Sequence, residues 1–215
     1  MAASANRGKE LLKNTGIIGF GTMCTKALAF LLLPLYTALL STSDYGTFDL
    51  VTTVGTLLVP IVNLQLSQAI FRFAAGARGD KEEMAAILTA VYIESGLLAA
   101  AYVVVFCAAA PLLSLPYKWV LLPYVLINVA LQLALYTARG VGDNVTYALG
   151  SFISASLTIA LNVVLLVGFS MGIDGMMASC CLGPLFGTLV VSLRTRLWRY
   201  FKPSLWSGAR ARSLT

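Results

Sequence analysis

Six long apolar stretches, separated by short polar segments, divide this chain and constrain its fold more than any other feature. They cover residues 15–40, 47–70, 84–110, 119–138, 147–169 and 175–193. A helix needs about 20 apolar residues to cross about 30 Å of hydrocarbon, and each stretch meets that requirement. A lone strand in lipid would leave its backbone N–H and C=O groups unpaired. The sequence therefore predicts an all-α integral membrane protein with six transmembrane helices.

The basic residues predict how these helices are oriented. All 15 Lys and Arg residues except Lys26 and Lys118 lie in the head, in the second and fourth loops or in the tail. Lys26 lies within the first span, and Lys118 alone lies on the opposite side. Cytoplasmic loops of membrane proteins carry an excess of Lys and Arg. The pattern predicts a multi-pass membrane protein with both termini in the cytoplasm and the lipid bilayer as its surroundings.

The composition excludes several other classes of protein. Only 11% of the residues are charged, whereas a soluble domain has about 25%. The net charge of +6 is spread over separate loops, which is not the footprint of a nucleic-acid-binding protein. The chain has no His, and its four Cys residues form no C-x-x-C motif, so we expect no enzyme activity, no metal site and no cofactor.

Two charged residues lie deep within spans. Lys26 lies about 11 residues into the first span and Glu94 about 10 residues into the third, which puts both about 16 Å from the cytoplasmic side. An unpaired charge at that depth costs about 3 kcal/mol or more. Two interpretations remain open. The residues form a pair that holds two helices together, or they line a cavity in which Lys26 meets an anionic substrate and Glu94 binds a coupling ion.

Uncharged polar side chains form the remaining candidates for a substrate cavity. They are Asn63, Ser67, Gln68, Asn128, Gln132 and Asn162. Asn63 and Ser67 are four residues apart and share a helix face, as do Asn128 and Gln132. Pro60, just before Asn63, is expected to kink its helix. Kinked helices with polar groups at this depth often line a cavity, but polar residues also form hydrogen bonds between helices.

Three more charged residues lie near the ends of spans. Asp49, near the outer end of the second span, is a second candidate for a coupling-ion site. Arg72 and Arg139 end the second and fourth spans on the cytoplasmic side, where each would act as a cytoplasmic gate or as an anchor to lipid headgroups. In addition, Gly168/Gly172 and Gly183/Gly187 have the G-x-x-x-G spacing that is compatible with close helix contact.

Several short segments, in order, resemble one known family. The opening NTGIIGFGTMCTKALAFLLLPLYTALLSTSDYGTFDL from Asn14 contains LPLYT and an L-S-x-x-D-Y-G turn. LSQAIFRF (66–73), ARG (138–140), LNVVLLV (161–167) and GIDGMMAS (172–179) follow at suitable spacing. Over residues 14–200 the chain resembles the polysaccharide biosynthesis proteins, the Wzx-type flippases of the multidrug/oligosaccharidyl-lipid/polysaccharide exporter superfamily.

The resemblance implies a MATE-like transporter built from two lobes of six helices around a central cavity. Its usual cargo is an undecaprenyl-pyrophosphate-linked oligosaccharide. Lys26 occupies the basic position of the family's first helix and would meet the pyrophosphate. The resemblance implies no cofactor, but Na⁺ or H⁺ would couple transport through Glu94 or Asp49.

The chain departs from the family's pattern in length. Family members have twelve or fourteen helices, whereas this chain has a basic head (1–13), one six-helix lobe (14–200) and a basic tail (201–215). We therefore expect a truncated or half-length flippase that needs either a homodimer partner or a separate second lobe. Alternatives are a multidrug exporter of the same superfamily and a membrane remnant or scaffold that transports nothing.

Overall fold

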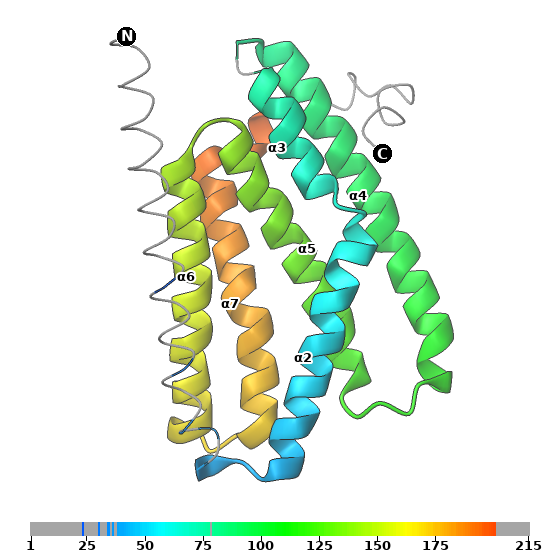
Figure 1. Ribbon diagram of the computed structural model, residues 1–215, viewed down its shortest axis with the longest axis vertical. Coiled ribbons are helices and arrows are strands. Elements are labelled where there is room, and N and C mark those ends of the chain that lie inside the picture. The colour runs from blue at the N-terminus through cyan, green and yellow to red at the C-terminus, as the bar shows by residue number, and fades with distance from the viewer. Residues whose placement is uncertain are drawn as a thin grey trace.

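The computed structural model describes residues 38–77 and 79–200, together with the isolated positions 23, 30, 34 and 36. Helices and turns make up these residues, and no strand occurs among them (Figure 1). The main helices are α2 (Thr42–Asn63), α3 (Leu66–Gly76), α4 (Lys81–Ala109), α5 (Lys118–Gly140), α6 (Asn144–Val163) and α7 (Gly172–Thr195). Short helices η1 (Ala110–Leu112), η2 (Val164–Gly168) and η3 (Leu197–Arg199) extend α4, α6 and α7. The predicted all-α fold class is confirmed.

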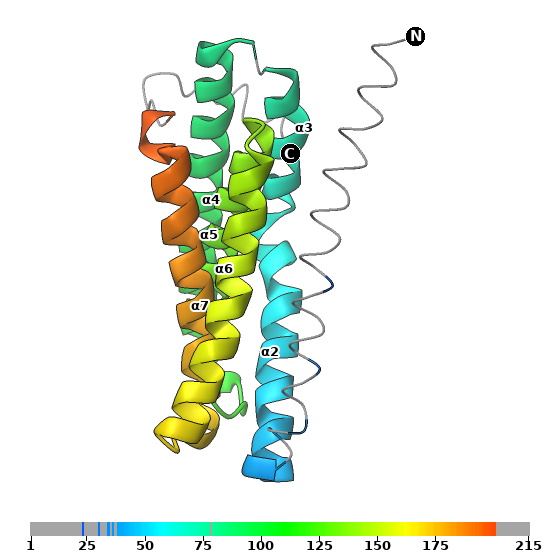
Figure 2. The same cartoon turned by 90° about the vertical axis from the view of Figure 1, so that its left-hand side faces the viewer.

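Five helices in the described part of the chain are long and apolar enough to cross a membrane. They are α2, α4 with η1, α5, α6 with η2, and α7, and they correspond to the predicted second to sixth spans. The predicted first span, with Lys26, lies outside the described residues apart from isolated positions. Figure 2 shows the long helices running side by side. The chain is a multi-pass membrane protein.

Acidic side chains set where helices begin. The carboxylate of Asp80 accepts hydrogen bonds from the backbone N–H groups of Glu82 and Glu83, so it caps the first turn of α4. The connection between α3 and α4 is also shorter than the sequence predicted. The second and third predicted spans leave residues 71–83 as a charged loop, whereas α3 continues to Gly76 and α4 begins at Lys81.

The predicted second span, residues 47–70, is divided into two helices. Leu64 (φ 44°) and Gln65 (φ 59°) adopt the left-handed conformation and separate α2 from α3. Pro60 has no N–H and already removes one hydrogen bond from the preceding turn. The Leu64 N–H then bonds to the carbonyl of Ile61, three residues back, at 3.3 Å. The kink expected at Pro60 is thus followed, one turn later, by a complete break.

Glycines on α7 allow it to pack closely against α6. A Cβ atom added to Gly183 would lie 1.9 Å from Thr158 Oγ1, and one added to Gly187 would lie 2.6 Å from Ser154 Cβ. Without side chains at these positions, the two backbones approach until they touch. The close helix contact that the Gly183/Gly187 spacing predicted is confirmed.

The Gly168/Gly172 pair has a different role. A Cβ atom on either residue would meet nothing within 4 Å. Gly172 has a φ of +57° and is the first residue of α7, directly after the turn that follows η2. This pair therefore belongs to a turn, and the helix contact that its spacing suggested does not form among the described residues.

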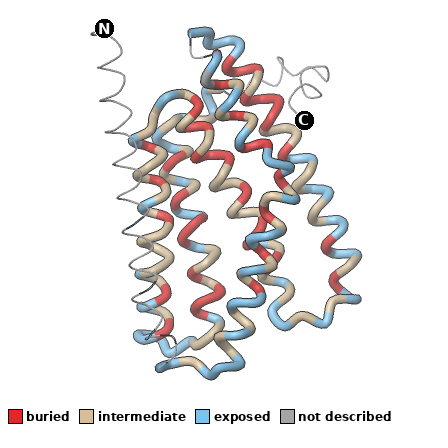
Figure 3. Tube along the Cα trace, viewed as in Figure 1, coloured by how far each residue is buried: buried red, intermediate tan, exposed pale blue. Residues whose placement is uncertain are grey.

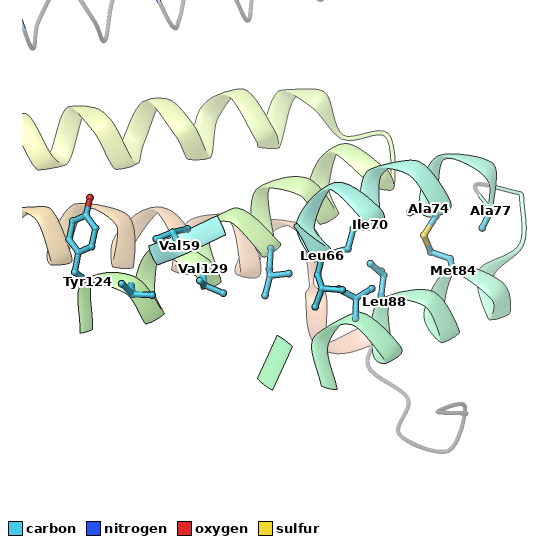
Figure 4. Close-up of a cluster of buried hydrophobic side chains, with 12 residues drawn as sticks. Val59, Leu66, Ile70, Ala74, Ala77, Met84, Leu88, Tyr124 and Val129 are labelled. Carbon is cyan, nitrogen blue, oxygen red and sulfur yellow. The ribbon is translucent and has the colours of Figure 1, made fainter. Parts of the chain in front are cut away.

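The largest apolar cluster lies where α2, α3, α4 and α5 meet (Figure 4). Its buried side chains include Leu66 and Ile70 on α3, Leu88 on α4 and Val125 on α5, each at most 1% exposed. Buried residues follow the inner faces of the helices, while the outer faces are largely exposed (Figure 3). Apolar side chains on the outer faces are expected of helices that cross a membrane.

Candidate functional site

A buried polar network lies at the break between α2 and α3. The side-chain amide of Asn63 donates to Ser67 Oγ at 3.1 Å, and Ser95 Oγ donates to Asn63 Oδ1 at 3.4 Å. The three side chains are 1%, 1% and 3% exposed, respectively. Asn63 thus bridges the break and connects it to the middle of α4.

This network satisfies polar groups that would otherwise be costly in the membrane. An unpaired buried polar group costs about 1–3 kcal/mol. Of the two roles predicted for Asn63 and Ser67, the arrangement favours hydrogen bonding between helices. Their low exposure leaves little surface for a substrate in the described structure.

Two glutamines present the accessible polar surface at the break. Gln68 Nε2 donates to Gln65 Oε1 at 2.8 Å, and both side chains are exposed. Gln68 was predicted as a cavity residue, whereas Gln65 was not. These amides lie at the start of α3 and present polar groups that are accessible without disturbing the buried network.

Glu94 lies next to Ser95 in the middle of α4. Its Oε2 atom is buried and has no hydrogen-bond partner. In the described part of the chain no ion pair reaches it. An ionised carboxylate buried in an apolar medium is costly unless a proton or a cation neutralises it, although the Glu94 side chain as a whole is only half-buried. Lys26 is not among the described residues, so its pairing with Glu94 stays a prediction.

The remaining uncharged candidates lie away from this network. Asn128 is half-buried on α5, and its amide donates to the carbonyl of Tyr124 in its own helix at 2.8 Å. Gln132 lies one turn further along α5 and is also half-buried. Asn162 on α6 is buried and accepts a hydrogen bond from Ser179 on α7. Its observed contact therefore joins two helices.

The predicted arginines differ in their surroundings. The guanidinium of Arg139, at the end of α5, lies 4.3 Å from the centre of the Phe71 ring and 5.6 Å from that of Tyr147. It therefore joins α3, α5 and α6 through cation–π contacts. Arg72 is exposed and lies 5.7 Å from the ring centre of Phe73; its role as a cytoplasmic gate or a headgroup anchor stays a prediction.

Asp49 is exposed on α2, 14 residues before Asn63 at the end of that helix, which is about 21 Å along the helix. The fold therefore does not bring the two coupling-ion candidates, Asp49 and Glu94, together. Of the two, Glu94 has the buried, unpaired oxygen.

Sequence reasoning missed the hydroxyl groups along α4. Besides Ser95, the Tyr92 hydroxyl lies 3.2 Å from Thr137 Oγ1 on α5, and Thr89 Oγ1 donates to the carbonyl of Tyr200 at 3.2 Å. Thr89, Tyr92 and Ser95 follow one another at intervals of three residues and so lie along one side of α4. The three-residue spacing is the signal in the sequence that could have predicted this row of hydroxyl groups. It does not stand out, because isolated hydroxyl groups are common in membrane helices.

Comparison with known protein families identifies the chain. A model of the family described as "Polysaccharide biosynthesis protein" matches residues 11–195. The chain belongs to this polysaccharide biosynthesis protein family. The match confirms the resemblance seen in the sequence, and it includes every helix from α2 to α7. Comparisons with curated proteins and with solved structures find no match.

Membership of the polysaccharide biosynthesis protein family relates the candidate site to transport in general. The family match includes Lys26, Glu94 and the break between α2 and α3. A helix bundle with a neutralisable carboxylate and accessible amides at a broken helix supplies polar contacts within the membrane. Such contacts are what a polar cargo requires when it crosses hydrocarbon.

Proposed function

We propose that this chain is one lobe of a flippase that moves a lipid-linked oligosaccharide, such as an undecaprenyl-pyrophosphate-linked one, across the bacterial inner membrane. The observation that carries the proposal is the family match over residues 11–195 in a chain with at least five spanning helices. In this proposal the chain transports its cargo and catalyses no covalent step.

The distribution of basic residues supports cytoplasmic termini. The end of the lobe with the α3–α4 and α5–α6 connections holds Arg72, Lys81 and Arg139, whereas the opposite end holds Lys118. With the basic end in the cytoplasm, the chain follows the positive-inside rule.

A single lobe encloses only one side of a cavity, so we propose that a second lobe completes the transporter. A second copy of this chain is one way to supply it. The close packing of α6 on α7 suits a rigid element, and the break between α2 and α3 suits a point of bending. In this mechanism Lys26 meets the pyrophosphate, and Glu94 exchanges a proton or Na⁺ as the lobes rock.

The test is a flipping assay in vesicles that contain the full chain and a fluorescent lipid-linked oligosaccharide. We compare the wild type with Lys26→Ala, Glu94→Gln and, as a matched control at an exposed position, Lys81→Ala. Lys26→Ala should abolish flipping while the amount of folded protein stays unchanged. Glu94→Gln should remove the dependence on the ion gradient, and Lys81→Ala should behave as the wild type.

Each result has a stated meaning. Loss of folded protein in Lys26→Ala would show that Lys26 and Glu94 form a structural pair. Export of a cationic dye without oligosaccharide flipping would favour the multidrug alternative. If neither cargo moves, even at protein densities at which chemical crosslinking shows dimers, the chain alone is not a transporter. A chain that runs strictly as a monomer in mild detergent contradicts the homodimer.

A further inference from the structure

The segment that follows α7 folds back onto α4 at the basic end of the lobe. Arg196 adopts the left-handed conformation (φ 51°) and ends α7, and η3 then leads the chain to Tyr200. Thr89 Oγ1 on α4 donates to the Tyr200 carbonyl at 3.2 Å, and the Tyr200 side chain packs against the largest apolar cluster. Leu197 packs against α5 and α7. Residues 196–200, which we call the strap, thus connect the end of α7 to the first half of α4, at the same end of the lobe (Figure 2).

Two neighbouring cavities lie between the strap and the helices. The first has a volume of about 330 Å³, lies between α4 and the strap, and is lined by Leu88, Tyr92, Leu197, Trp198 and Tyr200. The second, of about 250 Å³, lies between α4, α5 and α7 and is also lined by Tyr92 and Leu197. The two cavities meet at these shared side chains, and we call them together the strap groove. Most of its surface is apolar.

The strap groove has the length of an acyl chain in one leaflet. Along α4 it runs from Leu88 to Ala99, which is about 16 Å at 1.5 Å per residue. That is about half of the roughly 30 Å hydrocarbon core. Gly96 leaves one side of the groove open, because this residue is exposed and a Cβ atom there would meet nothing within 4 Å. Since α4, α5 and α7 are spanning helices, a lipid chain can enter the groove from the membrane beside Gly96.

Hydroxyl groups line part of the groove, but the protein itself satisfies three of the four. The Tyr92 hydroxyl lies 3.2 Å from Thr137 Oγ1, and Ser95 Oγ donates to Asn63 Oδ1 at 3.4 Å. Thr188 Oγ1 donates to a carbonyl of its own helix at 2.8 Å. The groove therefore borders the buried polar network at Ser95, yet it offers mainly carbon atoms to a ligand. No acidic residue is among the described residues that line it.

Arginines flank the groove where the strap forms its wall. Arg196 directly precedes the lining residue Leu197. Arg199 lies between two further lining residues, Trp198 and Tyr200. Both arginines are exposed, and in the described part of the chain neither forms an ion pair. Guanidinium groups bind phosphate through paired N–H donors, and basic pockets beside spanning helices bind anionic headgroups. The charges and the apolar walls together match an anionic lipid.

We propose that the strap groove binds one acyl chain of a phosphatidylglycerol molecule, with the lipid phosphate on Arg196 and Arg199. Phosphatidylcholine and phosphatidylethanolamine carry a cation next to the phosphate, which two arginines would repel, whereas phosphatidylglycerol carries none. The bound lipid fills the space between the strap and α4 and so holds the strap in place. It is a structural lipid that stays with the lobe, and its test measures binding without measuring flipping.

Trp198 provides a probe within the site, because it lines the groove. The experiment uses the full chain with Trp119→Phe and Trp206→Phe, so that Trp198 is the only tryptophan. The protein is placed in phosphatidylcholine vesicles that contain increasing fractions of phosphatidylglycerol or phosphatidylcholine with brominated acyl chains, which quench the Trp198 fluorescence on contact.

Half-maximal quenching should require several-fold less brominated phosphatidylglycerol than brominated phosphatidylcholine. Gly96→Phe should remove this preference by filling the groove, whereas Gly96→Ala, its matched control, should keep it. Arg199→Gln should reduce the preference several-fold. Lys81→Gln removes one positive charge from the same end of the lobe but outside the groove, and it should keep the preference. Because a Cβ atom at Gly96 meets nothing within 4 Å, the Gly96 variants keep the test valid if Arg199→Gln fails to fold.

Three outcomes would overturn the proposal. Equal quenching by the two brominated lipids, in the chain that keeps Gly96, Arg199 and Lys81, means that Trp198 meets only bulk lipid. A preference that survives Gly96→Phe means that anionic lipid gathers around the basic end without entering the groove. An equal loss of preference in Lys81→Gln and Arg199→Gln means that net charge attracts the lipid, without a phosphate site on the strap.

Discussion

The contact between α6 and α7 gives the sharpest prediction about stability, through the substitution Gly183→Ala. The new Cβ atom would lie 1.9 Å from Thr158 Oγ1, 2.8 Å from Thr158 N and 2.9 Å from Ser154 O. The hydroxyl can rotate if it gives up its 2.9 Å hydrogen bond to Ser154 O. The two backbone atoms cannot rotate, so the helices must move apart by several tenths of an ångström.

The expected cost follows from this geometry. Overpacking a close contact costs about 1–3 kcal/mol. In a protein of this size, 1 kcal/mol lowers Tm by about 2–4 °C, so a cost of about 2 kcal/mol predicts a fall of about 4–8 °C. Gly96→Ala on α4 is the matched control, because a Cβ atom there meets nothing within 4 Å. It should leave Tm unchanged or raise it slightly, since Ala favours helix more than Gly does.

The assay is thermal unfolding of the full chain in mild detergent, followed by the loss of the folded peak in size-exclusion chromatography. Adding Thr158→Ala to Gly183→Ala should recover part of the loss, because it removes the hydroxyl contact but not the backbone contacts. Equal Tm values for Gly183→Ala and Gly96→Ala would refute the close packing of α6 on α7.

Three further predictions concern the break and the orientation. Asn63→Ala should lower the free energy of unfolding by about 1–2 kcal/mol, because it leaves two buried serine hydroxyls without their partner; an unchanged Tm would contradict the network. Leu64→Gly should raise stability by about 1 kcal/mol, because glycine adopts a φ of 44° without steric cost; a lower Tm would argue against strain at the break. In a cysteine-free variant, Ser114→Cys should react with an impermeant maleimide in intact cells, whereas Gly79→Cys should react only after permeabilisation; the reverse pattern would contradict cytoplasmic termini.

Much of the fold could be predicted from local sequence. Asp80 and Asp143 cap helices because their carboxylates reach backbone N–H groups a few residues ahead. The Gly183/Gly187 spacing predicted a close helix contact, because this spacing too is visible in a short stretch of sequence. The break at Leu64 and Gln65 could not be predicted in the same way, since neither residue type favours the left-handed conformation. Packing of α3 against α4 and α5 holds the chain in that conformation.

The candidate site could be predicted only in part. Asn63, Asn128 and Asn162 look equivalent in the sequence, as amides within apolar spans. In the structure, Asn63 bridges a break, Asn128 bonds to its own helix, and Asn162 joins α6 to α7. Their partners depend on which helices are neighbours and how each is rotated, and neither is a local property.

The sequence by itself determined that this protein is a helical membrane protein, and it predicted the orientation, because hydrophobicity and charge act directly between each segment and the bilayer. The tertiary structure decided which polar groups satisfy one another and which remain available. It buried Asn63, Ser67 and Ser95 in a closed network, while Glu94 Oε2 has no hydrogen-bond partner among the described residues. It also opened an apolar groove of about 470 Å³ between α2 and α4. Each of these features depends on how helices distant in sequence meet.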